Sequence, residues 1–406
     1  MANYWKKKIG IIIVRVLKPC TLGNKESRCP FGEEMAGFFA MAKPRIEHLY
    51  VHVPFCTHLC PYCAFVKTKN SLPEMKTFLP SLLAELKAAR EEFDLQPKTI
   101  FFGGGTPTAL SISQLETLFQ EWPWKGSGAE FTVESNPATI SADKARVLVE
   151  AGVNRISLGV QSFDPDLLKL LGRTHDREQV LKTVGILRKA GLSNLNLDLM
   201  FALPGQSLEQ WRTSLQEAVE IKPEHISCYN LTYEEDTEFF DRLNHGQYQV
   251  DEKVERGFFL ESDRLLTEAG FEHEEISNFA KPGFSCAHNW SYWRGEDYLG
   301  LGPGAFSTVG GRRWQNETTV EAYARRVEKE GSARKDIEVL SPGTLRGERI
   351  MLGLRTNQGV MLTEMAPWEN ELKELRQAGL IQLKGETVIL TAEGSLLADS
   401  IAELFL

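Results

Sequence analysis

From residue 46 onward, two patterns of apolar and polar positions take turns along the chain. Short apolar runs of the kind that form buried strands begin near residues 48, 98, 130, 155, 194 and 225. Each run precedes a longer segment in which apolar residues recur every three or four positions, as on one face of a helix. These helical segments span 75–93, 111–122, 141–152, 177–191, 207–221 and 251–270. The pattern therefore predicts six strand–helix units in succession.

Strand–helix units in a row are typical of a parallel sheet with helices outside it. Six units are too few for a complete eight-stranded barrel. We therefore expect an α/β fold built as a partial (β/α)6 barrel of the TIM type. Glu134, Gln161 and Asp198 each lie where a predicted strand is about to become a loop. Because the carboxyl ends of barrel strands form the functional face, these three side chains are site candidates.

The pattern changes after residue 275. The segment 281–307 is rich in glycine and aromatic residues, and the C-terminal part then predicts three helices and a hairpin around Lys384, Gly385 and Glu386. This outline indicates an α+β domain that contains a winged-helix-like segment. The segment lacks a strongly basic helix, so we expect it to serve packing or docking rather than DNA binding.

Residues 1–41 show no steady period. Their basic start and the apolar run 9–17 weakly resemble a secretory signal, but the run contains Arg15 and no small-residue cleavage site follows it. The run is also far shorter than the ~20 residues that span a bilayer. We expect an irregular N-terminal extension over 1–41, translated from an upstream start codon. A core barrel over 42–275 and a C-terminal domain over 276–406 would follow.

The composition narrows the class of protein. Apolar residues make up 42% of the chain and charged residues 25%, which is ordinary for a globular protein. A net charge of −9 and a pI near 5.6 disfavour a nucleic-acid partner. Seven cysteines, an odd number, do not form a disulfide framework and favour a reducing cytoplasm. We expect no transmembrane segment and leave peripheral membrane contact open.

Three of the cysteines, Cys56, Cys60 and Cys63, form a CxxxCxxC motif after the first predicted strand. Three thiolates can hold a four-iron cluster and leave one iron open for a substrate. A structural zinc ion commonly needs a fourth ligand, for which His52 or His58 is available. The spacing favours the cluster and leaves zinc as the alternative.

A glycine run, Gly103–Gly105, follows the second predicted strand and continues into Thr106 and Pro107. Glycines let a ligand approach the backbone closely and leave N–H donors accessible. Alone, such a run indicates no more than a tight turn. At the functional face of a barrel it becomes a candidate site for a carboxylate or an amine.

With these motifs, the chain resembles the radical S-adenosylmethionine (SAM) superfamily over residues 46–275. CxxxCxxC with an aromatic residue, Tyr62, before its last cysteine, followed by GGGTP on the second strand, is the signature of that superfamily. The stretches YVHVPFC, VESNP, GVQSF, LGRTH and DLMFALPGQ are similar to one branch of it. That branch contains oxygen-independent coproporphyrinogen III oxidase and the HemW-type haem chaperones.

The resemblance implies a set of cofactors and contacts. The three cysteines would hold a 4Fe–4S cluster, and SAM would chelate its open iron. An electron from the reduced cluster would cleave SAM into methionine and a 5′-deoxyadenosyl radical. The residues that the resemblance assigns to SAM are Tyr50, Tyr62, Gly104, Gly105, Thr106, Glu134, Gln161, Arg173 and Asp198.

Two features resemble the haem chaperones more than the oxidase. The oxidase has a fourth cysteine two positions after the third, where this chain has Phe65, as HemW-type chains do. The segment HNWSYW, which begins at His288, matches an HNxxYW motif associated with haem binding in HemW-type proteins. Histidine is a competent axial ligand of haem iron. A purely structural role for His288 in a glycine-rich turn is the alternative.

The resemblance therefore implies a chaperone that binds haem as cargo and delivers it to haem-requiring proteins. The alternative is an enzyme of porphyrin biosynthesis that decarboxylates coproporphyrinogen III to protoporphyrinogen IX, so no catalytic residue is assigned. Neither the haem-accepting proteins nor a homodimer can be read from the sequence.

Overall fold

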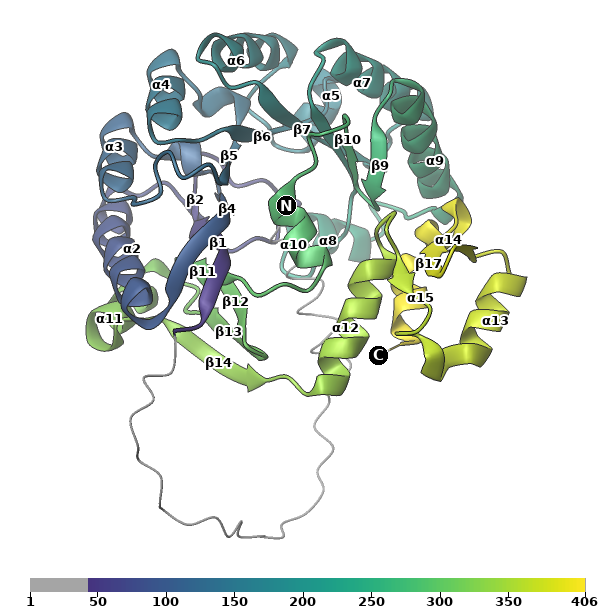
Figure 1. Cartoon of the computed structure of the whole chain (residues 1–406). Coiled ribbons are helices and arrows are strands. Elements are labelled where there is room, and N and C mark those ends of the chain that lie inside the picture. The colour runs from purple at the N-terminus through teal and green to yellow at the C-terminus, as the bar shows by residue number, and fades with distance from the viewer. Residues whose placement is uncertain (1–42, 406) are drawn as a thin grey trace, which may run out of the picture.

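The computed structural model describes residues 43–405, so the expected N-terminal extension over 1–41 lies outside the described residues. One nine-stranded sheet dominates the fold, in the order β11-β1-β4-β5-β6-β7-β8-β10-β9. Figure 1 shows this sheet curving into an open ring with helices on its outer side. The predicted partial barrel of the α/β class is therefore confirmed.

The six predicted strands are present in the predicted order, and neighbouring strands among them pair in parallel. They are β1 (Arg45–Val53), β4 (Asp94–Gly104), β5 (Glu130–Ser135), β6 (Arg155–Gln161), β7 (Asn194–Phe201) and β8 (His225–Asn230). Parallel pairing brings the carboxyl ends of all six strands to one edge of the barrel. Residues from distant parts of the sequence therefore meet at this edge.

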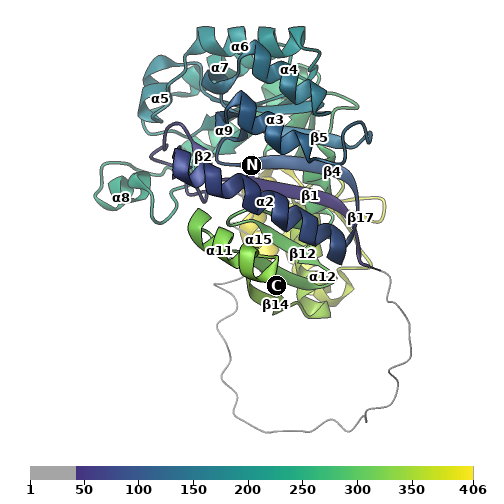
Figure 2. The ribbon, with the colours of Figure 1, turned by 90° about the vertical axis from the view of Figure 1, so that its left-hand side faces the viewer.

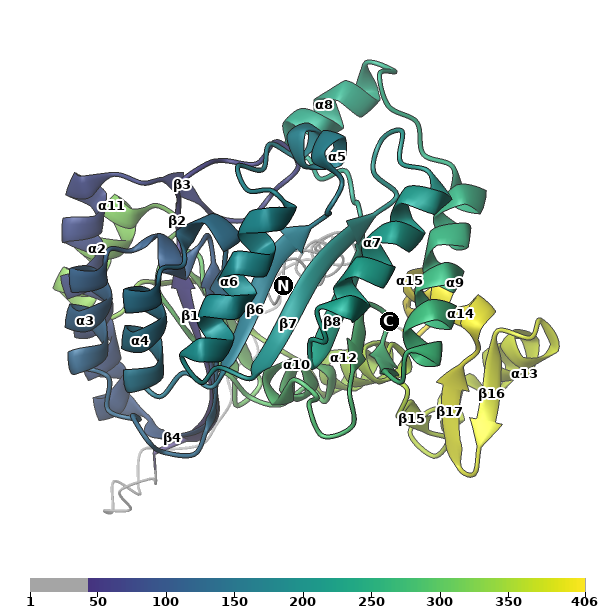
Figure 3. The ribbon, with the colours of Figure 1, turned by 90° about the horizontal axis from the view of Figure 1, so that it is seen from above.

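The predicted helices cover the outer face of these strands (Figure 3). They are α2 (Leu72–Glu92), α3 (Ile112–Gln120), α4 (Ala142–Glu150), α6 (Arg177–Lys189), α7 (Leu208–Glu220) and α9 (Glu252–Glu268). The side chains of Ser111, Ser141 and Ser207 cap three of them by accepting a hydrogen bond from a first-turn amide. The main core lies between these helices and the sheet.

The barrel sheet continues beyond the six predicted units. β10 (Asn278–Ala280) pairs antiparallel with β8, β9 (Glu272–Glu275) pairs antiparallel with β10, and β11 (Leu299–Leu301) pairs in parallel with β1. The short helix α10 (Ala287–Trp293) lies between β10 and β11 in the chain. It is at the end of the barrel where the strands begin (Figure 3). The division of the chain into domains at residue 275 stays a prediction. β10 and β11 lie after that residue in the sequence and belong to the barrel sheet.

A second sheet lies beside α2. It consists of β12 (Phe306–Val309), β13 (Arg312–Asn316) and β14 (Arg334–Val339), and α11 (Val320–Glu330) accompanies it. Figure 2 shows α11 next to α2. The buried carboxylate of Glu85 on α2 accepts hydrogen bonds from Tyr323 Oη at 2.7 Å, Asn316 Nδ2 at 2.7 Å and the Gly302 amide at 2.8 Å. One carboxylate thus joins three separate segments.

The C-terminal residues form the predicted winged-helix-like segment, with a small core of its own. It contains α12 (Pro342–Leu354), β15 (Val360–Met361), α13 (Glu369–Gln377), β16 (Ile381–Lys384), β17 (Thr387–Leu390), α14 (Ala392–Leu396) and α15 (Ala398–Glu403). The hairpin turns at Gly385, as predicted. Within residues 43–405, no helix is both long and apolar enough to cross a membrane.

Four short elements at the carboxyl edge of the barrel were not predicted. They are β2 (Phe55–Cys56), β3 (Thr68–Lys69), α5 (Pro165–Leu170) and α8 (Glu238–Asn244). β2 and β3 pair in parallel and enclose the cysteine loop between them. The amide of Phe239 on α8 donates a hydrogen bond to the Pro61 carbonyl, so α8 is attached to that loop.

Candidate functional site

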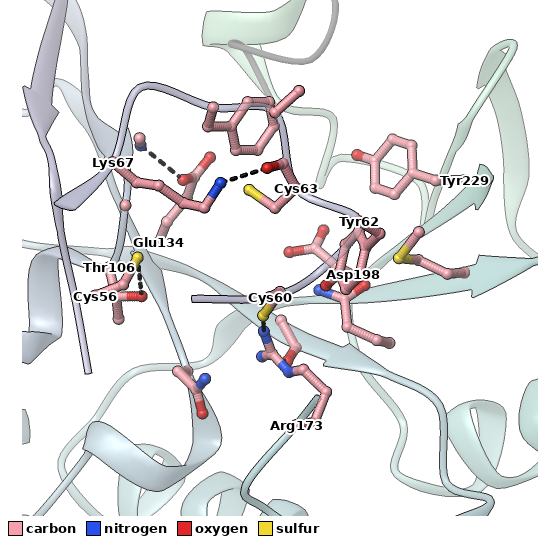
Figure 4. A pocket seen from close by; sticks show the side chains of 18 of the residues that line it. Cys56, Cys60, Tyr62, Cys63, Lys67, Thr106, Glu134, Arg173, Asp198 and Tyr229 are labelled. Carbon is pink, nitrogen blue, oxygen red and sulfur yellow. Dashed lines mark hydrogen bonds between the residues drawn. The ribbon is translucent and has the colours of Figure 1, made fainter. Parts of the chain in front are cut away.

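A cavity of about 180 Å³ lies at the carboxyl edge of the barrel strands. Its walls are the cysteine loop after β2, the glycine turn after β4, and the ends of β5 to β8 (Figure 4). Most of the residues that the sequence assigns to cofactors line it: Cys56, Cys60, Tyr62, Cys63, Gly104, Gly105, Thr106, Glu134, Gln161, Arg173 and Asp198. The fold therefore brings together side chains from six places in the sequence.

The three cysteines are free thiols on one loop that lines the cavity. Cys56 ends β2, and the loop turns back where the Cys63 amide donates to the Cys60 carbonyl over 3.3 Å. Burial raises the pKa of the Cys56 thiol to about 11 and also raises the pKa of Cys63. Metal binding to these thiols would therefore release protons.

Each cysteine has a hydrogen-bond donor beside it. Thr106 Oγ1 donates to Cys56 Sγ over 3.7 Å, and Arg173 Nη1 donates to Cys60 Sγ over 3.6 Å. Lys67 Nζ donates to the carbonyl of Cys63, as Figure 4 shows. Donors and positive charges beside sulfur stabilise the thiolate form that binds iron.

The glycine turn fits closely against its neighbours. A side chain at Gly103 would meet the Glu134 carboxylate at 2.9 Å, and one at Gly105 would meet the Phe55 carbonyl oxygen at 2.7 Å. Gly104 has a φ of +107° and donates its amide to Glu134 Oε2 over 3.1 Å. Only glycine suits these positions, and the result is a backbone surface that faces the cavity.

Gln161 and Arg173 are placed by the end of β6. Gln161 has a φ of +69°, which is an uncommon backbone conformation for a residue other than glycine. The pairing of β6 with β7 shifts its register between Gly159 and Gln161. Arg173 Nη2 donates to the Gly159 carbonyl over 2.6 Å. This bond holds the guanidinium between β6 and the cysteine loop.

Asp198 on β7 is the buried acid of the cavity. It accepts hydrogen bonds from Ser157 Oγ at 3.0 Å and from Asn196 Nδ2 at 2.7 Å. Burial, with a contribution from the nearby Glu134 carboxylate, raises the pKa of Asp198 to about 6. The same cavity is also lined by the cations of Arg173 and Lys67 and by the carboxylates of Glu134 and Glu234, so it suits a ligand that carries charges of both signs.

Tyr50 and His288 do not line this cavity. Tyr50 is fully buried in β1, stacks on Phe101 and makes a 3.0 Å hydrogen bond to His52 Nδ1. His288 is fully buried at the other end of the barrel, with Nδ1 2.7 Å from Thr99 Oγ1. Its second ring nitrogen is 3.0 Å from Tyr292 Oη. The role of Tyr50 beside SAM and that of His288 as a haem ligand stay predictions, and neither residue is accessible as placed.

Several residues at the site were not singled out from the sequence. They are Phe65, Lys67, Asn136, Ser157, Met200, Tyr229 and Leu231, of which Phe65 was considered only as a missing cysteine. Phe65 and Lys67 lie in the cysteine loop, and this closeness to the cysteines in sequence is a signal that could have found them. The others lie on or just after barrel strands, where the side that faces the cavity depends on the register, which sequence pattern alone leaves undetermined.

No group of three His, Cys, Asp or Glu side chains within residues 43–405 is arranged to hold a single metal ion. The zinc alternative also loses one proposed ligand, because His52 Nε2 is bonded to the Val66 carbonyl at 2.7 Å and Nδ1 to Tyr50. A four-iron cluster spreads its ligands over several iron atoms, so three thiols around one cavity fit it better than a lone ion.

Comparison with known proteins identifies the class. The sequence model of the Radical SAM superfamily matches residues 50–218. A solved structure, coproporphyrinogen III oxidase (HemN) from Escherichia coli, has the same fold. Its TM-score is 0.77 and its sequence identity is 24%, and the match covers 90% of each chain. The barrel and its cysteine cavity therefore belong to the radical SAM superfamily.

Curated relatives narrow this to one family. The heme chaperone HemW of Bacillus subtilis is 37% identical over 378 residues, which cover 89% of this chain and 99% of the relative. HemW of Lactococcus lactis is 36% identical, with 88% and 96% covered. HemW of Escherichia coli is 40% identical, with 64% and 70% covered. The chain belongs to the HemW family.

Proposed function

We propose that this protein is a haem chaperone, which binds haem and delivers it to haem-requiring proteins. The observation that carries the proposal is the similarity to relatives named heme chaperone over nearly their whole length. Phe65 supports it, because it stands at the cavity where the oxidase branch has a further cysteine. The segment HNWSYW, with its buried aromatic side chains, supports it as well.

The cavity is proposed to hold the family's cofactors. Cys56, Cys60 and Cys63 would bind the 4Fe–4S cluster, and Thr106 and Arg173 would donate to its sulfur ligands. When bound, the cluster and SAM together supply one-electron chemistry. The residues of this chain would contribute binding and orientation.

The charged and polar groups of the cavity would orient SAM. Glu134 and the glycine turn would bind the amino group of its methionine part, and the Arg173 guanidinium would suit its carboxylate. Asp198 accepts hydrogen bonds and suits a ribose hydroxyl, as does the Gln161 side chain. Tyr62 packs against Phe239 of α8, 6.1 Å between ring centroids, and so fixes one wall.

The runner-up function is the decarboxylation of coproporphyrinogen III to protoporphyrinogen IX. The likeness to the HemN structure shows the fold alone at 24% identity. The relatives that match at 36–37% identity over nearly their whole length are named heme chaperone. The chaperone proposal therefore has the stronger support.

The test compares both functions on one preparation. The protein is purified without oxygen, its cluster is reconstituted, and haem titration and coproporphyrinogen turnover are measured side by side. A saturable haem complex without turnover supports the proposal. Turnover without a stable haem complex contradicts it. A Cys60→Ala variant should lose the absorbance of the cluster, whereas Cys228→Ala, a buried thiol outside the cavity, should keep it.

The proposed setting is a reducing cytoplasm. All cysteines within residues 43–405 are free thiols, which fits such a compartment. The partners would be haem and the proteins that accept it. A homodimer and peripheral membrane contact stay open, and nucleic acid is not among the proposed partners, because the chain carries a net charge of −9.

A further inference from the structure

The strands β6, β7 and β8 present polar side chains to the interior of the barrel. On β7, Leu195, Leu197 and Leu199 pack in the main core beneath the helices. Because side chains alternate along a strand, Asn196 and Asp198 point to the opposite side, which is the barrel interior. Asp198 lines the cavity that contains the cysteines, whereas Asn196 lies one alternation deeper and does not line it.

The register of the sheet places three polar side chains in one row across these strands. Ser157 on β6 pairs with Asn196, and Asn196 pairs with His225 on β8. All three side chains are buried. Asn196 Nδ2 donates to Ser157 Oγ over 2.8 Å, and His225 Nδ1 lies 2.7 Å from Asn196 Oδ1. The row therefore crosses three strands directly beneath Asp198.

Asp198 accepts one hydrogen bond from this row on each of its carboxylate oxygens. Asn196 Nδ2 donates to Oδ1 over 2.7 Å, and Ser157 Oγ donates to Oδ2 over 3.0 Å. Both donors lie toward the amino ends of the strands, so each oxygen keeps acceptor capacity on its cavity side. Because each oxygen has its own donor, the carboxylate is also held against rotation.

The hydrogen positions in the row follow from the Asp198 carboxylate. The reverse orientation of the Asn196 amide would place its oxygen against that carboxylate, so Nδ2 faces Asp198 and Oδ1 faces His225. His225 must then donate through Nδ1–H. Burial and the neighbouring Arg155 lower the pKa of His225 well below its usual range, so the ring is neutral and carries its one hydrogen on Nδ1. The hydrogen bonds thus run in one direction, from His225 through Asn196 to Asp198.

We propose that Asn196 and His225 are positioning residues for the ribose of SAM, and that they act through Asp198. The inference rests on the proposed function of the cavity as a SAM site, in which Asp198 accepts a hydrogen bond from a ribose hydroxyl. A carboxylate that rotated freely would have to be ordered when the ligand binds, at a cost in affinity. Asn196 and Ser157 hold the carboxylate beforehand, and His225 holds the Asn196 amide in turn. Neither Asn196 nor His225 lines the cavity, so we expect neither to contact SAM directly.

The test compares two ligands that differ only in the groups expected to contact Asp198. SAM and an analogue without the 2′- and 3′-hydroxyls are bound to the full chain with its reconstituted cluster. Their dissociation constants are measured by anaerobic equilibrium dialysis. Asn196→Ala should weaken the binding of SAM about tenfold. It should change the binding of the analogue by less than about twofold, because the analogue has no hydroxyl for Asp198, whereas general damage to the fold would weaken both ligands alike.

Two replacements of His225 test the outer end of the row. His225→Asn keeps an N–H donor near the position of Nδ1, whereas His225→Leu removes the donor and keeps an apolar side chain. His225→Leu should weaken the binding of SAM about fivefold, and His225→Asn should stay within about twofold of wild type. This pair keeps the inference testable if Asn196→Ala does not fold.

Asn316→Ala serves as the matched control. Asn316 is fully buried, and its Nδ2 donates to the buried Glu85 carboxylate over 2.7 Å, as Asn196 does to Asp198. Neither Asn316 nor Glu85 lines the cavity. Asn316→Ala should therefore lower the thermal stability but leave the dissociation constants of both ligands within about twofold of wild type.

The outcomes separate the inference from the proposal beneath it. Absence of saturable SAM binding by the wild type overturns the proposed SAM site itself. Wild-type binding with an equal loss for both ligands in Asn196→Ala, or with no loss for SAM, overturns the positioning role and leaves the SAM site standing. Equal affinities of His225→Leu and His225→Asn for SAM overturn the part assigned to His225. A loss confined to SAM in Asn196→Ala and His225→Leu, together with wild-type affinity in His225→Asn, supports both the site and the positioning role.

Discussion

The buried acid Asp198 gives the sharpest test of the cavity as the structure shows it. Its pKa is raised to about 6 from an ordinary value near 3.8, chiefly by burial. Ionised Asp198 therefore costs stability in the protein without cofactors. Replacing it by asparagine keeps an oxygen for Ser157 and for Asn196 and removes the charge.

The size and sign of the effect follow from the pKa. A pKa difference of about two between the folded and unfolded states changes the free energy of unfolding by at most about 3 kcal/mol. Because the folded pKa lies above the unfolded one, the stabilising contribution is complete below about pH 4 and is lost as the pH rises through about 6. The free energy of unfolding of Asp198→Asn should therefore equal that of wild type near pH 4 and exceed it by up to about 3 kcal/mol at pH 8. For a chain of this size, that is a rise of about 2–4 °C in Tm.

The assay is thermal and denaturant unfolding of the cofactor-free protein between pH 4 and pH 8. Asp143→Asn serves as the control, because the Asp143 side chain is 68% exposed on α4 and should show no such dependence. A difference between Asp198→Asn and wild type that does not grow with pH would refute the reasoning. So would a loss of stability at pH 8.

Two further predictions concern packing. Gly104→Ala should lower the free energy of unfolding by about 2 kcal/mol or more, because its new carbon would lie 2.4 Å from the His52 ring at a φ of +107°. Gly126→Ala, with a φ of +74° and open space around it, should cost only about 1 kcal/mol. Glu85→Leu should cost about 3 kcal/mol by leaving buried donors such as the Tyr323 hydroxyl unpaired, and Glu85→Gln should cost less. Urea unfolding measures all four, and equal losses within either pair would contradict the stated causes.

Much of the fold followed from periodicity. Each of the six strand–helix units carried its own signal, because a strand buried on both faces is an apolar run and an outer helix has one apolar face. The short elements, such as β2, β3 and β11, carried no periodic signal of this kind. β11 has only three residues, and its pairing with β1 depends on a contact between residues 250 positions apart in the chain. Local pattern does not contain that information.

Part of the candidate site could also be predicted from the sequence, and part could not. Cys56, Cys60 and Cys63 were recognisable from spacing, and the fold brought Glu134 and Asp198 to the same cavity as predicted from strand ends. Ser157 and Tyr229 line the same cavity and were missed, because the side of a strand that faces inward depends on its register, which local pattern does not contain.

The measurement that tests the central claim most directly is haem transfer. The protein is loaded with haem, freed of excess, and mixed with a haem-requiring enzyme that has been stripped of its haem. The account predicts that the Soret band of the carrier declines as the activity of the acceptor appears, and that coproporphyrinogen III is not consumed by the same preparation. Haem that stays on the carrier while the acceptor remains inactive, or steady turnover of coproporphyrinogen III, would contradict it.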